Sequence, residues 1–99
     1  MKVFFAPAAK LDLLGIGENI GQENPTRAIS LVDELIDRCY TLADLPRRYP
    51  LVPRYEHWGI RRCVYGNYLI FCRVRENAVD VVYVLHGAMD YESMLFPNL

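Results

Sequence analysis

Residues 59–75 read GIRRCVYGNYLIFCRVR, and this stretch decides the fold. Two β-prone runs, Ile60–Tyr65 and Tyr68–Arg75, flank the dipeptide Gly66-Asn67, whose residues readily adopt the positive φ angles of a two-residue hairpin turn. A turn of this length fixes the register of the two strands. The expected cross-strand pairs are Tyr65 with Tyr68, Cys63 with Ile70, and Arg61 with Cys72.

A third strand, Ala78–His86, follows the short turn Glu76-Asn77. A two-residue turn places Asp80 opposite Arg73, where we expect an exposed salt bridge. Alternation along the strands predicts one apolar and one mixed face. The apolar face, on which helices should pack, comprises Cys63, Ile70, Cys72, Val74, Val79, Val81, Tyr83 and Leu85, with Arg61 at its rim. The mixed face, where exposed chemistry would lie, comprises Ile60, Arg62, Val64, Leu69, Phe71, Arg73, Arg75, Asp80, Val82, Val84 and His86.

The N-terminal part predicts a strand followed by a helix. The segment Lys2–Ala6 is β-prone and is stopped by Pro7, which suits the first position of a helix that Gly21 would end. Gly15 and Gly17 lower the propensity of this helix by about 1 kcal/mol each relative to alanine, but they would let another helix approach closely. The apolar positions at helical spacing are Leu11, Leu13, Leu14, Ile16 and Ile20.

A second helix has a clearer signal. Asn24 is a good N-cap residue, and Pro25 fits the first turn. The short connection 21–23 would make the two helices an antiparallel hairpin. The continuous apolar stripe of the second helix comprises Ala28, Leu31, Val32, Leu35, Cys39, Leu42 and Ala43, widened by Ile29, Ile36 and Tyr40.

Residues 44–58 carry Pro46, Pro50 and Pro53, which exclude a helix and favour an extended, exposed loop. The net charge of −1 divides unevenly along the chain: −3 over residues 1–44, +6 over residues 45–75 and −4 over residues 76–99. All seven cations of the middle block are arginines, which suit bidentate contacts with carboxylate or phosphate groups. The block is either a solvated face or a patch that binds nucleic acid or an acidic partner segment.

The length of 99 residues fits a single domain, 1–99, and a hydrophobic fraction of 53% excludes a disordered chain. No apolar run approaches the roughly 18 residues of a membrane span. The apolar stretch near the N-terminus is also shorter than that of a signal peptide, so we expect a cytoplasmic protein. Cys39, Cys63 and Cys72 have no metal-ligand spacing, and we expect each to be a buried small hydrophobe.

His86 and Asp90, near Arg61, Arg62 and Arg73, could form an acid–base site for RNA cleavage, which needs a proton donor, a proton acceptor and cations on the phosphate. The alternative is that His86 ends a strand and hydrogen-bonds locally. The segment Gly87–Leu99 is too apolar to stay solvated, and we expect it to pack as a short helix.

Taken together, the residues resemble the RelE/ParE toxin superfamily of bacterial toxin–antitoxin systems. The resemblance rests on residues 6–14 (APAAKLDLL), on Asn24-Pro25 with Ala28, on residues 59–74 and on residues 84–90 (VLHGAMD). It implies an α+β fold in the order β-α-α-β-β-β. In this fold an N-terminal strand precedes an antiparallel helical hairpin packed on an antiparallel β-sheet, and a short C-terminal helical tail follows.

The resemblance leaves two activities to choose between. RelE-like members are ribosome-dependent mRNA endonucleases, and their reactive set would here be Arg61, Arg73, His86 and Tyr91. ParE-like members are non-enzymatic poisons of DNA gyrase. Many members of the superfamily read His-Gly-x-Arg-Asp after the last strand, and Met89 replaces that arginine. Only two lysines and a net charge of −1 also disfavour work inside ribosomal RNA. We therefore favour the ParE branch, with a RelE-type ribonuclease or a non-catalytic interaction module as alternatives.

The ParE resemblance implies a ParD-like antitoxin bound in a hetero-oligomer and DNA gyrase as the target. It implies no cofactor, no metal, no membrane and no direct sequence-specific binding of nucleic acid. We expect an acidic, amphipathic antitoxin segment to fold on binding into an apolar groove between the helices. The expected antitoxin contacts are Ile16, Ile20, Ile29, Val32, Ile36, Arg47, Arg48 and Arg54. The expected target contacts are Arg61, Arg73, Met89, Asp90, Tyr91, Leu95 and Phe96.

Overall fold

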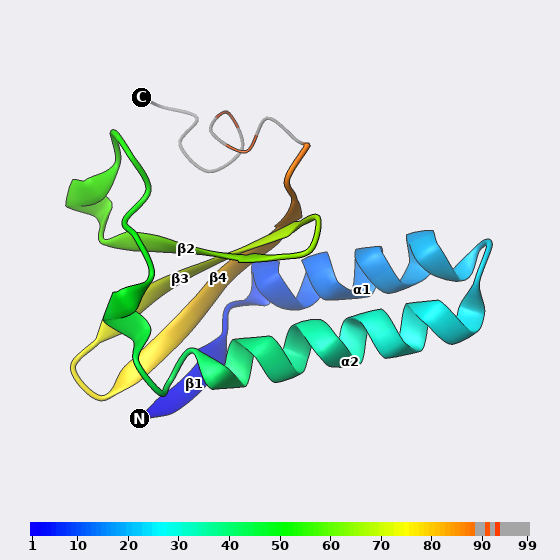
Figure 1. Cartoon of the computed structure of the whole chain (residues 1–99), viewed down its shortest axis with the longest axis horizontal. Helices are drawn as coiled ribbons and strands as arrows, with labels where there is room; N and C mark the ends of the chain where they lie inside the picture. The colour runs from blue at the N-terminus through cyan, green and yellow to red at the C-terminus, as the bar shows by residue number, and fades with distance from the viewer. Residues whose placement is uncertain (89–90, 92, 94–99) are drawn as a thin grey trace.

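The computed structural model describes residues 1–88, 91 and 93. A four-stranded sheet forms one layer, and a helical hairpin packs on one of its faces (Figure 1). This arrangement confirms the α+β class and the order of the elements. They are β1 (Lys2–Phe5), α1 (Pro7–Gly21), α2 (Pro25–Thr41), β2 (Ile60–Tyr65), β3 (Tyr68–Arg75) and β4 (Ala78–His86).

Both helices begin where the sequence predicts. Pro7 and Pro25 open α1 and α2, and the Asn24 side chain accepts a hydrogen bond from the backbone N–H of Arg27 at 3.0 Å. Within the described part of the chain, no helix is long and apolar enough to cross a membrane. The apolar stripe of α2 packs with α1 and the sheet in the main core, whose buried residues are Ala9, Leu13, Leu31, Leu35, Cys39, Leu42, Cys63, Ile70, Cys72, Val79, Val81 and Val84.

The sheet has the strand order β1-β4-β3-β2 and is mixed, not antiparallel as expected. The first strand runs parallel to β4, with Lys2 opposite Ala78 and Phe5 opposite Val81. The two helices supply the crossover that a parallel pair requires. A hairpin signal fixes the pairing of neighbouring strands, but it does not encode the direction in which a distant strand joins the sheet.

The predicted register of β2 and β3 is confirmed for all three pairs, and Gly66 in the turn has a φ of 57°. Arg73 also lies opposite Asp80 as expected, but the predicted salt bridge between them is wrong. Asp80 instead accepts two hydrogen bonds from the diagonal neighbour Arg75, at 2.6 and 2.9 Å. Arg73 donates to the carbonyl of Trp58, at 2.8 and 3.2 Å.

A β-bulge changes the predicted faces of β4. Phe71 pairs with Tyr83 and Cys72 with Val81, so Val82 has no partner of its own in β3. The extra residue reverses the alternation beyond this point. Val84 therefore packs in the main core, whereas Tyr83 and Leu85, predicted for the helix-covered face, belong to the cluster on the other face.

The sheet face away from the helices has its own small core. Phe71 on β3 is fully buried, together with Leu69 and Leu85, under Val52 and Tyr55 from the loop before β2. The sequence predicted an extended, exposed loop here, and this prediction is only partly right. The loop contains two short 3-10 helices, Pro46–Arg48 and Glu56–Trp58, and a bridge between Leu51 and Arg61. A proline can open such a turn because the first position needs no N–H donor.

The three cysteines are buried free thiols, as predicted. Burial raises the pKa of the Cys39 thiol to about 12 and that of the Cys72 thiol to about 11, and it also raises the pKa of Cys63. The predicted C-terminal helix falls mostly outside the described residues, which include only 87, 88, 91 and 93 of that segment.

Candidate functional site

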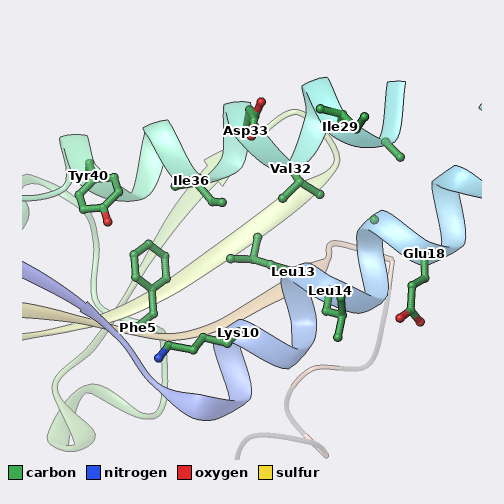
Figure 2. Close-up of a pocket in the computed structure, with 12 residues that line it drawn as sticks. Phe5, Lys10, Leu13, Leu14, Glu18, Ile29, Val32, Asp33, Ile36 and Tyr40 are labelled. Carbon is green, nitrogen blue, oxygen red and sulfur yellow. The ribbon is translucent and has the colours of Figure 1, made fainter. Parts of the chain in front are cut away.

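An apolar groove of about 770 Å³ runs between the outer faces of α1 and α2. Figure 2 shows Leu13 on α1 and Val32 and Ile36 on α2 pointing into the space between the helices. At one end Phe5 meets Tyr40 edge to face, with ring centroids 5.6 Å apart. The groove residues are Phe5, Lys10, Leu13, Leu14, Gly17, Glu18, Ala28, Ile29, Val32, Asp33, Ile36 and Tyr40.

Small residues set the depth of this groove. Gly17 lies so close to α2 that a Cβ atom there would stand 3.3 Å from Cγ2 of Val32, and a Cβ on Gly21 would stand 3.6 Å from the Cβ of Ala28. The helices therefore approach closely below the groove, while larger side chains remain on its walls. Ile29 is 68% exposed and Leu14 is also exposed, although both are apolar. Apolar side chains on two facing helices are typical of a surface that a partner covers.

Three of the five predicted apolar antitoxin contacts, Ile29, Val32 and Ile36, line the groove. Ile16 and Ile20 do not line it; both are half-buried and pack against the main core. Sequence reasoning missed Phe5, Leu14 and Tyr40 as groove residues. For Leu14, the sequence did contain a signal: α1 carries more apolar residues than a single buried stripe requires, so some of them must face outward.

The predicted arginines of the loop lie outside the groove lining. Arg48 stacks on Tyr49, with the guanidinium carbon 5.0 Å from the ring centroid, and donates to the Tyr49 hydroxyl at 2.8 Å. Arg47 is exposed, and its carbonyl accepts a hydrogen bond from Arg61 at 3.1 Å. Arg54 adopts a positive φ of 76°.

Arg61 and Arg73, predicted as target contacts, hold the loop on the sheet. One Arg61 nitrogen donates to the carbonyls of Arg47 and Tyr49, at 3.1 and 2.8 Å, on one side of β2. Arg73 binds the Trp58 carbonyl. Among the other target contacts, Met89, Asp90, Leu95 and Phe96 lie outside the described residues.

The four residues of the ribonuclease alternative do not meet in one place. Tyr91 accepts a hydrogen bond from Arg62, not Arg61, at 2.9 Å and packs on Phe71 with ring centroids 5.1 Å apart. His86 lies opposite Tyr68, at the other end of β3 from Arg73 and about 17 Å of strand away. Its Nδ1 accepts the N–H of Ala88 at 3.1 Å, which is the local role considered for it.

Two residues of α2 and β2 link the helical layer to the sheet. The Tyr65 hydroxyl donates to Glu34 at 2.6 Å, and Arg27 forms a salt bridge with the same carboxylate. Both contacts hold the pKa of Glu34 below its ordinary value, and the Tyr65 hydrogen bond has a larger effect than the Arg27 contact. The hydrogen bond to Glu34 in turn raises the pKa of Tyr65. The network fixes α2, and with it one wall of the groove, relative to the sheet.

Solved structures share this fold at low sequence identity. The chromosomal ParDE system from P. aeruginosa has a TM-score of 0.74 and 16% identity, over 87% of this chain and 95% of that chain. The RelBE2 complex from Mycobacterium tuberculosis has a TM-score of 0.66 and 22% identity, over 89% and 92% of the two chains. The RelB–RelE complex from Methanococcus jannaschii has a TM-score of 0.53 and 19% identity, over 97% and 99%.

No curated protein matches the chain significantly. The family model described as "ParE toxin of type II toxin-antitoxin system, parDE" matches residues 3–91, which include both helices, the groove and all of the sheet except Lys2. The chain therefore belongs to the ParE toxin family of type II toxin–antitoxin systems.

Proposed function

We propose that this chain is a cytoplasmic toxin that a ParD-like antitoxin neutralises by filling the groove between α1 and α2. The observation that carries the proposal is the open apolar groove itself, with Ile29, Leu14 and Tyr40 exposed along it. An amphipathic helix is a suitable occupant, because it would lay a stripe of apolar side chains along the groove. The ParDE and RelBE structures with this fold are toxin–antitoxin systems by name, which supports a partner of this kind.

The charges around the groove specify the polar face of the antitoxin segment. Lys10 stands on one side, with Glu18 and Asp33 at other positions of the lining. An antitoxin helix should therefore carry an acid near Lys10 and cations near Glu18 and Asp33. The acidic residues that we expect elsewhere in the antitoxin would face Arg47, Arg48 and Arg54, beyond the groove.

For the target we propose DNA gyrase, acted on without catalysis by the toxin. Membership of the ParE family supports this choice. The separation of Arg61, Arg73, His86 and Tyr91 supports it further, because acid–base cleavage of RNA needs its groups within hydrogen-bonding reach of one phosphate. We also keep Arg61, Arg73, Met89, Asp90, Tyr91, Leu95 and Phe96 as proposed target contacts.

Two assays run side by side test the target. The purified protein is incubated with gyrase, ATP and supercoiled plasmid, and separately with ribosomes and a defined mRNA. We expect linear DNA trapped with gyrase and an intact message. Cleaved message with undisturbed gyrase would establish the ribonuclease alternative, and inactivity in both assays would favour an interaction module.

A further inference from the structure

The sheet face away from the helices is only partly covered. Val52 and Tyr55, from the loop before β2, cover one part of it. On the far side of this face, β1 contributes Phe4. Because Val3 and Phe5 pack against the main core, Phe4 between them points the opposite way, as alternation along a strand requires. Phe4 is 48% exposed, so a large apolar side chain stands on the open part of the sheet.

A row of three residues crosses this open part from β1 to β3. Phe4 lies opposite Asp80, and Asp80 lies opposite Arg73. Residues paired in this way have their side chains on the same face of the sheet. Arg75 reaches into the row: its guanidinium carbon lies 5.5 Å from the centroid of the Phe4 ring, and it donates two hydrogen bonds to Asp80. These contacts hold the ring and the charged groups in place.

Trp58 extends the row beyond β3. Because Arg73 donates to the Trp58 carbonyl at 2.8 Å, the end of the 3-10 helix Glu56–Trp58 is held beside this row. Trp58 is 40% exposed, and its ring lies 5.3 Å from that of His57, centroid to centroid. Aromatic residues and arginine are enriched at protein interfaces, and tryptophan and arginine are prominent among the few residues that carry most of the binding energy.

We propose that Phe4, Trp58 and Arg75 belong to the surface that contacts the target protein, so that this surface extends across the open sheet face from Arg73. The inference rests on the proposed function, since it takes gyrase as the target. The helices that form the groove pack on the opposite face of the sheet (Figure 1), so an antitoxin helix in the groove leaves this patch uncovered. Two of the proposed target contacts, Arg73 and Tyr91, already lie on the open face.

The charges of the patch favour a protein over a nucleic acid. Asp80 lies in the middle of the row and neutralises Arg75. Arg73 pairs with a carbonyl, which leaves its positive charge in place. A phosphodiester backbone would gain one cation and be repelled by the carboxylate. A protein surface with apolar groups for the two rings and one carboxylate for Arg73 fits all of these features.

The test uses the full chain in the gyrase trapping assay, with the toxin concentration varied. Phe4→Ala and Trp58→Ala should each raise the concentration needed for half-maximal trapping by about tenfold or more, because each removes an aromatic ring from the contact. Leu11→Ala is the matched control. Leu11 is an exposed apolar residue of α1 outside the groove, so this variant should trap gyrase as the unmodified chain does. All three variants should keep the unmodified affinity for the antitoxin, which shows that they are folded.

Footprinting with hydroxyl radicals gives the same information without a substitution, should Trp58→Ala fail to fold. Trp58 is the single tryptophan of the chain, so its oxidation is read from the mass of one peptide. Oxidation of Trp58 should fall severalfold in the complex with gyrase and DNA. It should stay unchanged in the complex with the antitoxin.

The outcomes separate this inference from the proposed function. Variants that trap gyrase as well as the unmodified chain does, or Trp58 oxidation that gyrase leaves unchanged, would overturn the inference and leave the target standing. Failure of the unmodified chain to trap gyrase would overturn the proposed target, and the inference with it. Binding to DNA alone, or a dimer of this chain, that both variants lose would also overturn the inference and assign the patch to that partner.

Discussion

The side chain of Asp12, on α1, accepts a hydrogen bond from the backbone N–H of Val84, on β4, at 2.9 Å. The partners are 72 positions apart in the sequence. Because β1 ends at Phe5, opposite Val81, no strand of the described residues pairs with the rest of β4 on that side. Asp12 thus supplies an acceptor for a backbone donor just past the point where pairing with β1 ends, and it fixes α1 on the sheet.

Substitutions at Asp12 should separate the hydrogen bond from the charge. Partial burial raises the pKa of this carboxyl above its ordinary value of 3.8, although the Val84 hydrogen bond opposes the shift. Asp12→Asn keeps an acceptor and removes the desolvated charge, so it should match or exceed the unmodified chain in stability at pH 7. Asp12→Ala should cost about 1 kcal/mol, because it leaves the Val84 N–H without its acceptor.

The pH dependence checks this assignment. A raised pKa in the folded state means that folding is favoured when the carboxyl is protonated and loses that contribution as the pH rises through the shifted value. The advantage of Asp12→Asn should therefore be present at pH 7 and disappear below about pH 3.8, where the unmodified side chain is neutral in both states. Denaturant unfolding at several pH values measures it, and an advantage independent of pH would contradict the explanation.

Ile29→Glu should abolish antitoxin capture without unfolding the toxin. Ile29 is 68% exposed in the groove, so the change in unfolding free energy should stay within about 0.5 kcal/mol, while binding should weaken by at least about 2 kcal/mol. Leu11→Glu is a matched control, because Leu11 is equally exposed on α1 but is not part of the groove. Calorimetric titration with the antitoxin compares the two, and equal losses would place the antitoxin elsewhere.

The sequence predicted the elements that depend on local signals. The Gly66-Asn67 turn fixed the β2–β3 register, and the Asn24 cap with Pro25 fixed the start of α2. What it missed has no local turn or cap signal. The parallel pairing of β1 joins residues far apart in the chain, and the bulge at Val82 lies in the middle of a strand. The bulge alone moved Leu85 to the other face.

The same limit explains the site. The helical spacing identified Ile29, Val32 and Ile36, but it could not tell which apolar residues of α1 face the core and which line the groove. The sequence analysis named Arg61 and Arg73 as target contacts because no local sequence pattern indicates that a guanidinium will donate to a backbone carbonyl. The structure shows both anchored to loop carbonyls.

The two glycines of α1 should respond differently to alanine. At Gly15 a Cβ would meet nothing within 4 Å, so Gly15→Ala should stabilise the protein by about 0.5–1 kcal/mol through helix propensity. At Gly17 the Cβ would stand 3.3 Å from Val32 Cγ2, so Gly17→Ala should gain less and should also weaken antitoxin binding in the groove. Thermal unfolding and titration of both variants test this, and equal stabilisation with equal binding would contradict the close approach.

The three thiols should resist alkylation in the folded protein. With the pKa of Cys39 raised to about 12 and that of Cys72 to about 11, almost no thiolate exists at pH 8, and burial blocks access as well. Iodoacetamide followed by mass measurement should leave the native chain unmodified and add three groups in guanidinium chloride. Fast labelling of the native chain would show that the core around α2 opens readily.

Tyr65→Phe should destabilise the protein in a window of pH set by two groups. The Tyr65 contact lowers the pKa of Glu34 from 4.5, so its stabilisation is present above that value and is lost as the pH falls through the lowered pKa. The same contact raises the pKa of Tyr65 from 10.0, so stabilisation is present below that value and is lost as the pH rises through the raised pKa. The Tm difference between the unmodified chain and the variant should therefore be largest between these limits and shrink on either side.

Tyr68→Phe is the control, since within the described residues the Tyr68 hydroxyl forms no hydrogen bond, and its Tm difference should not vary with pH. A Tyr65→Phe difference that stays constant from acid to alkaline pH would mean that the hydroxyl does not hold Glu34, and that α2 is fixed to the sheet by apolar packing alone.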